Sequence, residues 1–247
     1  MNVVIIIPTY NEEGHIGDTL KLLEHEISRI KNHVFDILVF DSCSTDKTIP
    51  YVKSLQVKYK NIHLIVEDKK SGLGGAYIQA MRYVMKHFNA DIIFECDADG
   101  SHQPKYVPMM MDAIEKGADV VVGSRYVPGG KIEANWAFHR RMISRVGNYV
   151  ARLFLTRKFH DITSGFRATK VFLLKDIALE NLLSKNYAYK IHLFWELHLR
   201  TDAIVEVPIT FLDREHGISK FPRNNMWESL KVVVMLRFRK LFSISAL

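Results

Sequence analysis

The sequence predicts a single α/β domain in which helices flank a mostly parallel sheet. Short apolar runs alternate with longer stretches whose apolar residues recur at helical spacing. Each apolar run ends in polar residues, as buried parallel strands do. The chain has 247 residues, of which 48% are hydrophobic and 25% charged, so it is long enough for one large domain with its own core.

Six runs predict the strands. The first five are Val3–Pro8, Ile37–Ser42, Ile62–Asp68, Asp91–Asp99 and Asp119–Tyr126. The sixth, Ala203–Arg214, alternates between apolar and polar residues and contains Pro208, which favours a strand at the edge of the sheet.

Helices are predicted between and after these runs. They are His15–Lys31, a helix that begins near Thr48, Ala76–Phe88, Tyr106–Glu115, Asn135–Leu155, Val171–Lys175 and a last helix from Met226, whereas Asp161–Ala168 is expected to be a loop. Right-handed crossovers bring the carboxyl ends of parallel strands to one edge, where ligands bind in such sheets. The polar residues that end the runs are therefore expected to share one crevice.

The charge balance indicates an anionic partner. The formal net charge is +7, and the basic excess concentrates after residue 125. A phosphorylated substrate or anionic lipid fits this balance, whereas nucleic acid does not, because no aromatic-interleaved basic module is present. The two cysteines, Cys43 and Cys96, form no disulfide framework and favour a reducing compartment. No window approaches the roughly 20 apolar residues that span a bilayer, so the chain is not expected to cross a membrane by itself.

Two carboxylates, Asp97 and Asp99, end the fourth run. They have two interpretations, a solvated acidic turn or a metal site. Hard cations such as Mg²⁺ take one or two carboxylates together with the phosphate oxygens of a substrate.

The other strand-end loops are equally open when each is taken alone. In Pro8–Glu13 a tyrosine and carboxylates suit a base and ribose, but Asn11 would also serve as a helix N-cap. Asp41 either faces a nucleotide or belongs to a helix cap. Lys70–Tyr77 is glycine-rich but lacks the spacing of a P-loop or of G-x-G-x-x-G, so it is a phosphate cradle or a tight turn.

Taken together and in order, the motifs resemble those of the inverting glycosyltransferase family 2, and within it those of the dolichol- and polyprenol-phosphate mannose synthases. They are PTYNEE, DSCSTDKT, SGLGGAY, DADGSHQP, GSRY, HRRMISR, DITSGFRA and DREHGISK. The resemblance runs from Pro8 to about Lys220. Its most discriminating parts are the segments that begin at Gly123, Asp161 and Arg214.

The resemblance implies a GT-A-like (Rossmann-like) catalytic domain over residues 1–220, followed by an amphipathic C-terminal helix over 221–247. It also implies inverting transfer of mannose from GDP-mannose to a polyprenyl (dolichyl) phosphate with Mg²⁺ or Mn²⁺. One alternative is a family member that uses UDP-glucose or another nucleotide sugar, with a lipid-phosphate or sugar acceptor. A second alternative is a non-catalytic, membrane-peripheral nucleotide-binding protein.

The same resemblance implies the site residues. Asp97 and Asp99 would hold the metal, with Asp99 as the direct ligand, and Arg125 would complete the catalytic group. The residues expected to bind the donor are Pro8, Tyr10, Glu12, Phe40, Asp41, Ser42, Asp97, Ala98, Asp99, Arg125, Arg214 and Lys220. Arginine offers phosphate oxygens a planar fork of donors.

Two positions depart from the family's pattern. Relatives commonly have two aspartates after the second strand, where this chain has Asp41 and Ser42, so the base of the donor is less firmly implied. Some relatives have a glutamine ligand to the metal where this chain has Ser101, and water is expected to fill that place.

For the acceptor, Arg140 and Ser144 lie one helical turn apart and match positions that bind the lipid phosphate. The alternative for these residues is a solvated basic face. A phosphate monoester has a second pKa of about 6, so it is largely ionised and attacks without a general base. Asp161 is therefore expected to be structural, either orienting Arg167 or capping a helix.

The last helix carries an apolar stripe next to basic residues. The stripe is Trp227, Leu230, Val234, Phe238 and Leu241, and the basic set is Lys231, Arg237, Arg239 and Lys240. This pattern fits a core helix or a helix at a membrane interface, and the polyprenyl acceptor favours the interface. The protein is therefore expected at the cytoplasmic side of a membrane, with a small membrane-anchoring subunit as a further candidate partner.

Overall fold

The computed structural model describes residues 1–133, 136, 138–212 and 224–244. Within this part of the chain one sheet of seven strands has the order β3-β2-β1-β4-β7-β5-β8. Its strands are β1 (Asn2–Thr9), β2 (Val34–Asp41), β3 (Ile62–Val66), β4 (Ile92–Glu95), β5 (Val120–Ser124), β7 (Arg167–Lys170) and β8 (Ile204–Pro208). All pair in parallel except β7, which runs antiparallel to both β4 and β5. A second, small sheet pairs β6 (Lys131–Ile132) with β9 (Thr210–Phe211).

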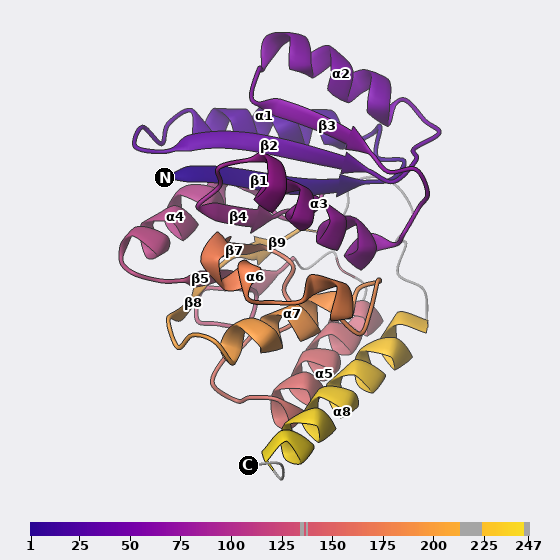
Figure 1. The fold of residues 1–247 in the computed structure, drawn as a ribbon, viewed down its shortest axis with the longest axis vertical. Coiled ribbons are helices and arrows are strands. Elements are labelled where there is room, and N and C mark those ends of the chain that lie inside the picture. The colour runs from indigo at the N-terminus through magenta and orange to yellow at the C-terminus, as the bar shows by residue number, and fades with distance from the viewer. Residues whose placement is uncertain (134–135, 137, 213–223, 245–247) are drawn as a thin grey trace.

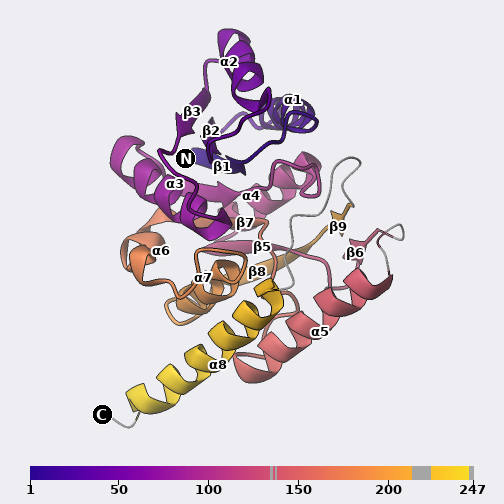
Figure 2. The same cartoon turned by 90° about the vertical axis from the view of Figure 1, so that its right-hand side faces the viewer.

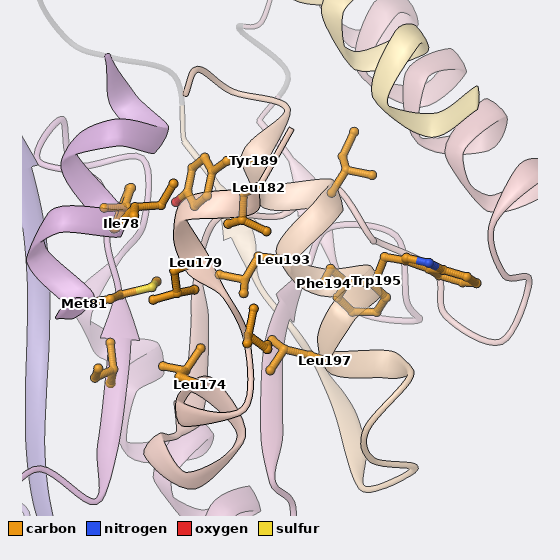
Figure 3. Packing of buried hydrophobic residues seen from close by; sticks show 14 of the residues in the cluster. Ile78, Met81, Leu174, Leu179, Leu182, Tyr189, Leu193, Phe194, Trp195 and Leu197 are labelled. Atoms are coloured by element: carbon orange, nitrogen blue, oxygen red, sulfur yellow. The ribbon is translucent and has the colours of Figure 1, made fainter. Parts of the chain in front are cut away.

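Helices cover both faces of the large sheet (Figure 1). They are α1 (Ile16–Ile27), α2 (Thr48–Lys58), α3 (Leu73–His87), α4 (Val107–Glu115), α5 (Phe138–Phe154), α6 (Val171–Lys175), α7 (Tyr189–His198) and α8 (Asn224–Ile244). Successive residues of a strand point to opposite faces. Ile5 of β1 accordingly joins the core under α1 and α4, whereas Ile6 joins the core under α3 and α7. Figure 3 shows this second core, in which Ile78 and Met81 of α3 face Tyr189 and Leu193 of α7.

The predicted α/β architecture and the predicted strands and helices are confirmed, including β8 at an edge of the sheet. The predicted strand Ala203–Arg214 is divided within the described residues into β8 and β9, which belong to different sheets. Strands β6 and β7, helix α7 and two 3-10 helices, Pro104–Tyr106 and Leu179–Asn181, were not predicted. Strand β7 has only four residues and lies partly within the segment expected to be a loop. Helix α7 is buried on nearly all sides, so its sequence lacks the one-sided apolar spacing that identifies a surface helix.

A fully buried ion pair connects two of these unpredicted elements, β7 and α7, to β4. Arg167 of β7 lies opposite Glu95 of β4 in the register, and its Nε donates to Glu95 Oε2 at 2.6 Å. Tyr189 of α7 donates to the other oxygen of Glu95 at 2.9 Å. The pair therefore holds β7 and the start of α7 at the carboxyl end of β4, where Asp97 and Asp99 follow.

Helices α5 and α8 lie side by side at the end of the molecule away from β3 (Figures 1 and 2). Val232, Val233 and Leu236 of α8 are buried against the rest of the protein. No helix among the described residues is long and apolar enough to span a membrane.

Candidate functional site

The loops that follow β1 and β2 are joined by a buried carboxylate, Asp41. Its two oxygens accept hydrogen bonds from Thr9 Oγ1 at 2.6 Å and from the backbone N–H and hydroxyl of Ser44, both at 2.7 Å. Asn11 has a positive φ of 51°, and its side-chain oxygen accepts from the Thr45 N–H at 2.8 Å. Asn11 therefore does not cap α1, and Asp41 shapes the crevice by holding its two loops together.

Other residues predicted to bind the donor lie at the carboxyl ends of β1 and β2 or in the loops that follow β1, β2 and β4, and several of them are buried. Pro8, Phe40, Ser42 and Ala98 are buried, and Phe40 and Ala98 belong to the hydrophobic core. Glu12 is half-buried in the loop after β1. Arg214 and Lys220 lie outside the described residues.

Residues between β3 and α3 form the neighbouring wall of the crevice. The Lys70 ammonium lies 3.1 Å from the centre of the Tyr10 ring, in a cation–π contact. Glu67 accepts hydrogen bonds from the Ser71 N–H at 3.0 Å, the Ser71 hydroxyl at 2.7 Å and the Gln79 amide at 2.9 Å. These bonds fix the loop that carries Lys70 beside Tyr10.

The glycines of this segment allow close packing within the protein. Gly72 has a φ of 87°, which favours glycine, and a Cβ there would approach Lys185 O to 2.7 Å. A Cβ on Gly74 would approach Asn186 O to 2.8 Å, and the Gly75 N–H donates to Lys185 O at 3.0 Å. Of the two interpretations of this segment, the contacts favour a tight turn against residues 185–186.

Asp97 and Asp99 are held in two different ways. Asp99 is bound within its own loop, where its Oδ1 accepts from the Ser101 N–H at 3.1 Å and the Ser101 hydroxyl at 2.6 Å. Asp97 is bound from helices, because Tyr77 of α3 donates to Oδ1 at 3.1 Å and Lys190 of α7 lies 3.4 Å from Oδ2. Neither Tyr77 nor Lys190 was predicted as part of the site.

The buried ring of His102 supports the loop from below. Its Nδ1 accepts the Asp97 N–H at 3.0 Å, and the ring stacks on Phe166 with a centroid distance of 5.0 Å. Burial lowers the pKa of His102 to about 4, so the ring is neutral near pH 7. His102 thus braces the backbone of Asp97 and adds no charge.

The chemistry of this loop fits a divalent cation that a substrate helps to bind. No group of three or more histidine, cysteine or acidic side chains within the described residues is arranged to hold a metal. Two carboxylates one residue apart are instead what Mg²⁺ or Mn²⁺ requires when phosphate oxygens complete its coordination. Asp99, with Asp97 next to it, is the residue that would hold such an ion.

On the other side of the crevice, Arg125 forms a two-pronged ion pair with Asp161. Its Nε lies 2.7 Å from Asp161 Oδ2, and its Nη2 donates to Oδ1 at 2.8 Å. Burial alone would raise the pKa of Asp161, but the Arg125 guanidinium outweighs burial and lowers it. Asp161 therefore orients Arg125 and not Arg167, as one expectation had it, because Arg167 is bound to Glu95.

Arg125 also reaches the predicted acceptor helix. Its Nη1 lies 3.4 Å from the hydroxyl of Ser144 on α5, and the Tyr126 hydroxyl lies 2.7 Å from the same oxygen. Arg140 stacks over the Trp136 ring at 4.5 Å. The structure thus brings GSRY and α5 together, and it adds Tyr126 to the residues expected from the sequence.

A cavity of about 360 Å³ opens beside this cluster. Three of its lining residues are basic and one is acidic. The lining is Arg125, Tyr126, Gly130, Lys131, Ile132, Glu133, Arg145 and Thr210. The Phe211 ring connects the two halves of the crevice, because it lies 5.5 Å from His102 and 5.5 Å from the Arg125 guanidinium.

Comparison with protein-family models matches residues 4–178 to the family described as "Glycosyl transferase family 2". The chain belongs to glycosyltransferase family 2. The undecaprenyl-phosphate mannosyltransferase of Micrococcus luteus is 39% identical to this family 2 transferase over 220 residues, which cover 89% of this chain and 87% of the relative. The polyprenol monophosphomannose synthase of Mycolicibacterium smegmatis is 36% identical over 228 residues, which cover 92% and 83%. The dolichol-phosphate mannosyltransferase of Pyrococcus furiosus is 32% identical over 238 residues, which cover 96% of this chain and 64% of the relative.

Solved structures of more distant relatives have the same fold. Glucosyl-3-phosphoglycerate synthase from Mycobacterium tuberculosis, in a complex with Mn²⁺, UDP and glucosyl-3-phosphoglycerate, superposes with a TM-score of 0.66 at 19% identity, covering 96% of this chain and 79% of that one. Mannosyl-3-phosphoglycerate synthase from Rubrobacter xylanophilus gives a TM-score of 0.68 at 17% identity, covering 100% and 76%. The predicted GT-A-like fold and the family resemblance are therefore confirmed.

The Arg125–Asp161 pair makes stability depend on pH. Because the folded-state pKa of Asp161 is lowered, its stabilisation is fully present above its unfolded value of about 3.9 and is lost as pH falls through the folded value. We expect Asp161→Asn to lower the free energy of unfolding near pH 7, and the difference from wild type to shrink below about pH 4. Urea unfolding at a series of pH values measures this, and a difference that stays constant down to pH 3 would contradict it.

Proposed function

We propose that this family 2 transferase transfers mannose from GDP-mannose to a polyprenyl phosphate, with inversion and with Mg²⁺ or Mn²⁺. The observation that carries the proposal is that the Phe211 ring contacts both His102, which holds the acidic loop at Asp97 and Asp99, and Arg125, which belongs to a basic, hydroxyl-bearing cluster with Ser144. The names of the three relatives, each of which joins mannose to a polyprenyl-type phosphate, support the same substrates.

In this proposal the acidic loop serves the donor. Asp99 would hold the cation, which supplies positive charge against the leaving diphosphate. Tyr10 and Lys70 form a wall suited to a base and its phosphates. The carboxylate of Asp41 already accepts hydrogen bonds from Thr9 and Ser44. Recognition of guanine is therefore assigned to the crevice as a whole rather than to Asp41.

The basic cluster would serve the acceptor. Asp161 binds one edge of the Arg125 guanidinium, and Nη1 on the other edge lies near Ser144. A phosphate bound between Nη1 and Ser144 would therefore accept hydrogen bonds from both the arginine and the hydroxyl. Arg125 was expected to bind the donor, and this position lets it lie between the two substrates. An ionised phosphate monoester needs no general base, which agrees with Asp161 being held in an ion pair.

Helices α5 and α8 support peripheral membrane binding. The expected stripe on α8 is largely exposed, with Trp227 at 68% and Phe238 at 54%, so it is not a core stripe. Helix α5 exposes further apolar side chains, namely Phe138, Met142, Ile143, Val146, Tyr149, Leu153 and Phe154. Exposed Lys231, Arg237 and Arg239 suit anionic headgroups, whereas the side chains of Lys240 and Leu241 lie outside those described.

This surface meets the needs of a polyprenyl acceptor, because such a lipid stays in the bilayer while its phosphate must reach Ser144 on α5. We therefore place the protein at the cytoplasmic side of a membrane. A small anchoring subunit is a further candidate for contact with the same two helices.

A donor panel tests the function directly. GDP-mannose should support transfer to polyprenyl phosphate in the presence of Mn²⁺, whereas UDP-glucose should not.

Asp99→Asn should lower turnover by about 10²–10³, since it removes an interaction that stabilises charge in the transition state. Mass spectrometry of the lipid product measures transfer. The exposed Asp112→Asn on α4 is the matched control and should behave as wild type. Normal turnover of a folded Asp99→Asn protein would refute the assigned role.

The acceptor assignment predicts a selective kinetic effect. Arg140→Ala should raise the KM for polyprenyl phosphate by about tenfold or more, because a hydrogen bond to a charged group contributes roughly 1.5–3 kcal/mol. The KM for GDP-mannose should change little. Arg82→Ala, an exposed position on α3, controls for loss of surface charge. A shift in donor saturation instead would mean that the two subsites are reversed.

The membrane assignment predicts that Trp227→Ser with Phe238→Ser weakens sedimentation with anionic liposomes. Arg237→Gln with Arg239→Gln should do the same at low salt, since each basic residue near an anionic surface contributes about 1 kcal/mol. Leu22→Ser and Val57→Ser, exposed on α1 and α2, form the control pair. Unchanged sedimentation of both α8 variants would show that α8 does not lie at the membrane.

A further inference from the structure

A buried lysine lies beside the proposed metal loop, and no motif assigns it a role. Lys190 is in the first turn of α7, and its ammonium lies 3.4 Å from Asp97 Oδ2. The lysine side chain is only 8% exposed, and that of Asp97 is 21% exposed. A buried ammonium is costly unless a partner holds it in good geometry.

The protein fixes Lys190 from several directions. Arg167 donates to its carbonyl oxygen at 3.4 Å, and the preceding Tyr189 is bound to Glu95. Figure 3 shows Tyr189 reaching from α7 toward Ile78 of α3. A Cβ on Gly165 would overlap the Lys190 ammonium. Because glycine has no Cβ, this position leaves room for the lysine side chain. The contact with Asp97 is therefore built by several elements at once.

Asp97 faces both a neutral donor and a positive charge. Ser101 offers Asp99 neutral donors. Asp97 likewise receives a neutral donor, the hydroxyl of Tyr77. Its other oxygen faces the positive charge of Lys190. The acidic loop thus carries an internal cation next to one of its two carboxylates.

We propose that Lys190 is a positioning residue that holds the Asp97 carboxylate and keeps the affinity of the loop for a free divalent cation low. A positive charge close to a cation site weakens binding of that cation by Coulomb repulsion. A nucleoside diphosphate adds negative charge and oxygen ligands, which offset the repulsion. The cation then binds strongly only together with the nucleotide, and by linkage each raises the affinity for the other equally. This inference rests on the proposed function.

A purely structural lysine would behave differently. If Lys190 only satisfied a buried carboxylate, its loss would loosen the loop and weaken every ligand together. If its charge opposes the free cation, removal of the charge strengthens cation binding while turnover falls. Opposite changes in cation affinity and turnover are therefore the signature of the proposed role.

The experiment measures Mn²⁺ binding to the full chain by electron paramagnetic resonance, without nucleotide and with GDP or UDP. Lys190→Gln keeps a donor near Asp97 but removes the charge, and Lys190→Met removes both. We expect both variants to bind Mn²⁺ without nucleotide about tenfold more tightly than wild type, a change of about 1.4 kcal/mol. The gain in Mn²⁺ affinity on adding nucleotide should shrink by the same factor, and kcat should fall most in Lys190→Met.

Lys170→Gln is the matched control, because it removes the charge from another lysine–aspartate pair, with Asp119 at 3.0 Å, at the end of β7 away from Asp97. Its Mn²⁺ affinity should equal that of wild type. Gly165→Ala displaces the ammonium by another route and should act like Lys190→Gln if Lys190→Met fails to fold.

The inference is overturned if folded Lys190→Gln binds free Mn²⁺ as wild type does or more weakly, or if Lys170→Gln changes the affinity equally. If wild type binds Mn²⁺ equally with and without either nucleotide, the coupling does not exist and the inference also fails. Transfer by the donor panel without any divalent cation would instead refute the metal in the proposed function.

Discussion

The ion pair between Arg167 and Glu95 is the interaction on which the arrangement of the site depends. It is buried in the sheet, where breaking one partner leaves an uncompensated charge and costs about 3–5 kcal/mol in comparable proteins. It fixes the one antiparallel strand between β4 and β5, and through Tyr189 it also holds the start of α7. The strand end that carries Asp97, the Gly165 segment and Lys190 are positioned together for this reason.

A second ion pair organises the opposite side of the crevice in a different manner. Asp161 binds Arg125 at two points, so the guanidinium has one orientation, and its net charge toward a ligand is reduced. The positive field on the proposed acceptor side therefore comes from neighbouring residues, including Lys131 and Arg145 around the cavity.

Much of the fold was predictable because it depends on local patterns. The run Val3–Pro8 indicates a buried strand through its length and composition, and the spacing in His15–Lys31 indicates a helix through one apolar face. Helix α7 escaped prediction because it is buried all round, and β7 because four residues that include Arg and Lys have no strand pattern. The motifs singled out Asp97, Asp99, Arg125 and Ser144 as candidates, but Lys190 becomes visible only when the chain is folded, since 93 positions separate it from Asp97.

Helix α5 combines two properties. Ser144 lies beside Arg125, while Phe138, Val146 and Tyr149 of the same helix are open to the surroundings. On the proposed function, adsorption to the bilayer and capture of the acceptor headgroup are one event. The search for acceptor then proceeds by lateral diffusion in two dimensions. Turnover would be governed by the mole fraction of acceptor lipid at the surface rather than by its bulk concentration, and one adsorbed molecule would complete many cycles before it desorbs.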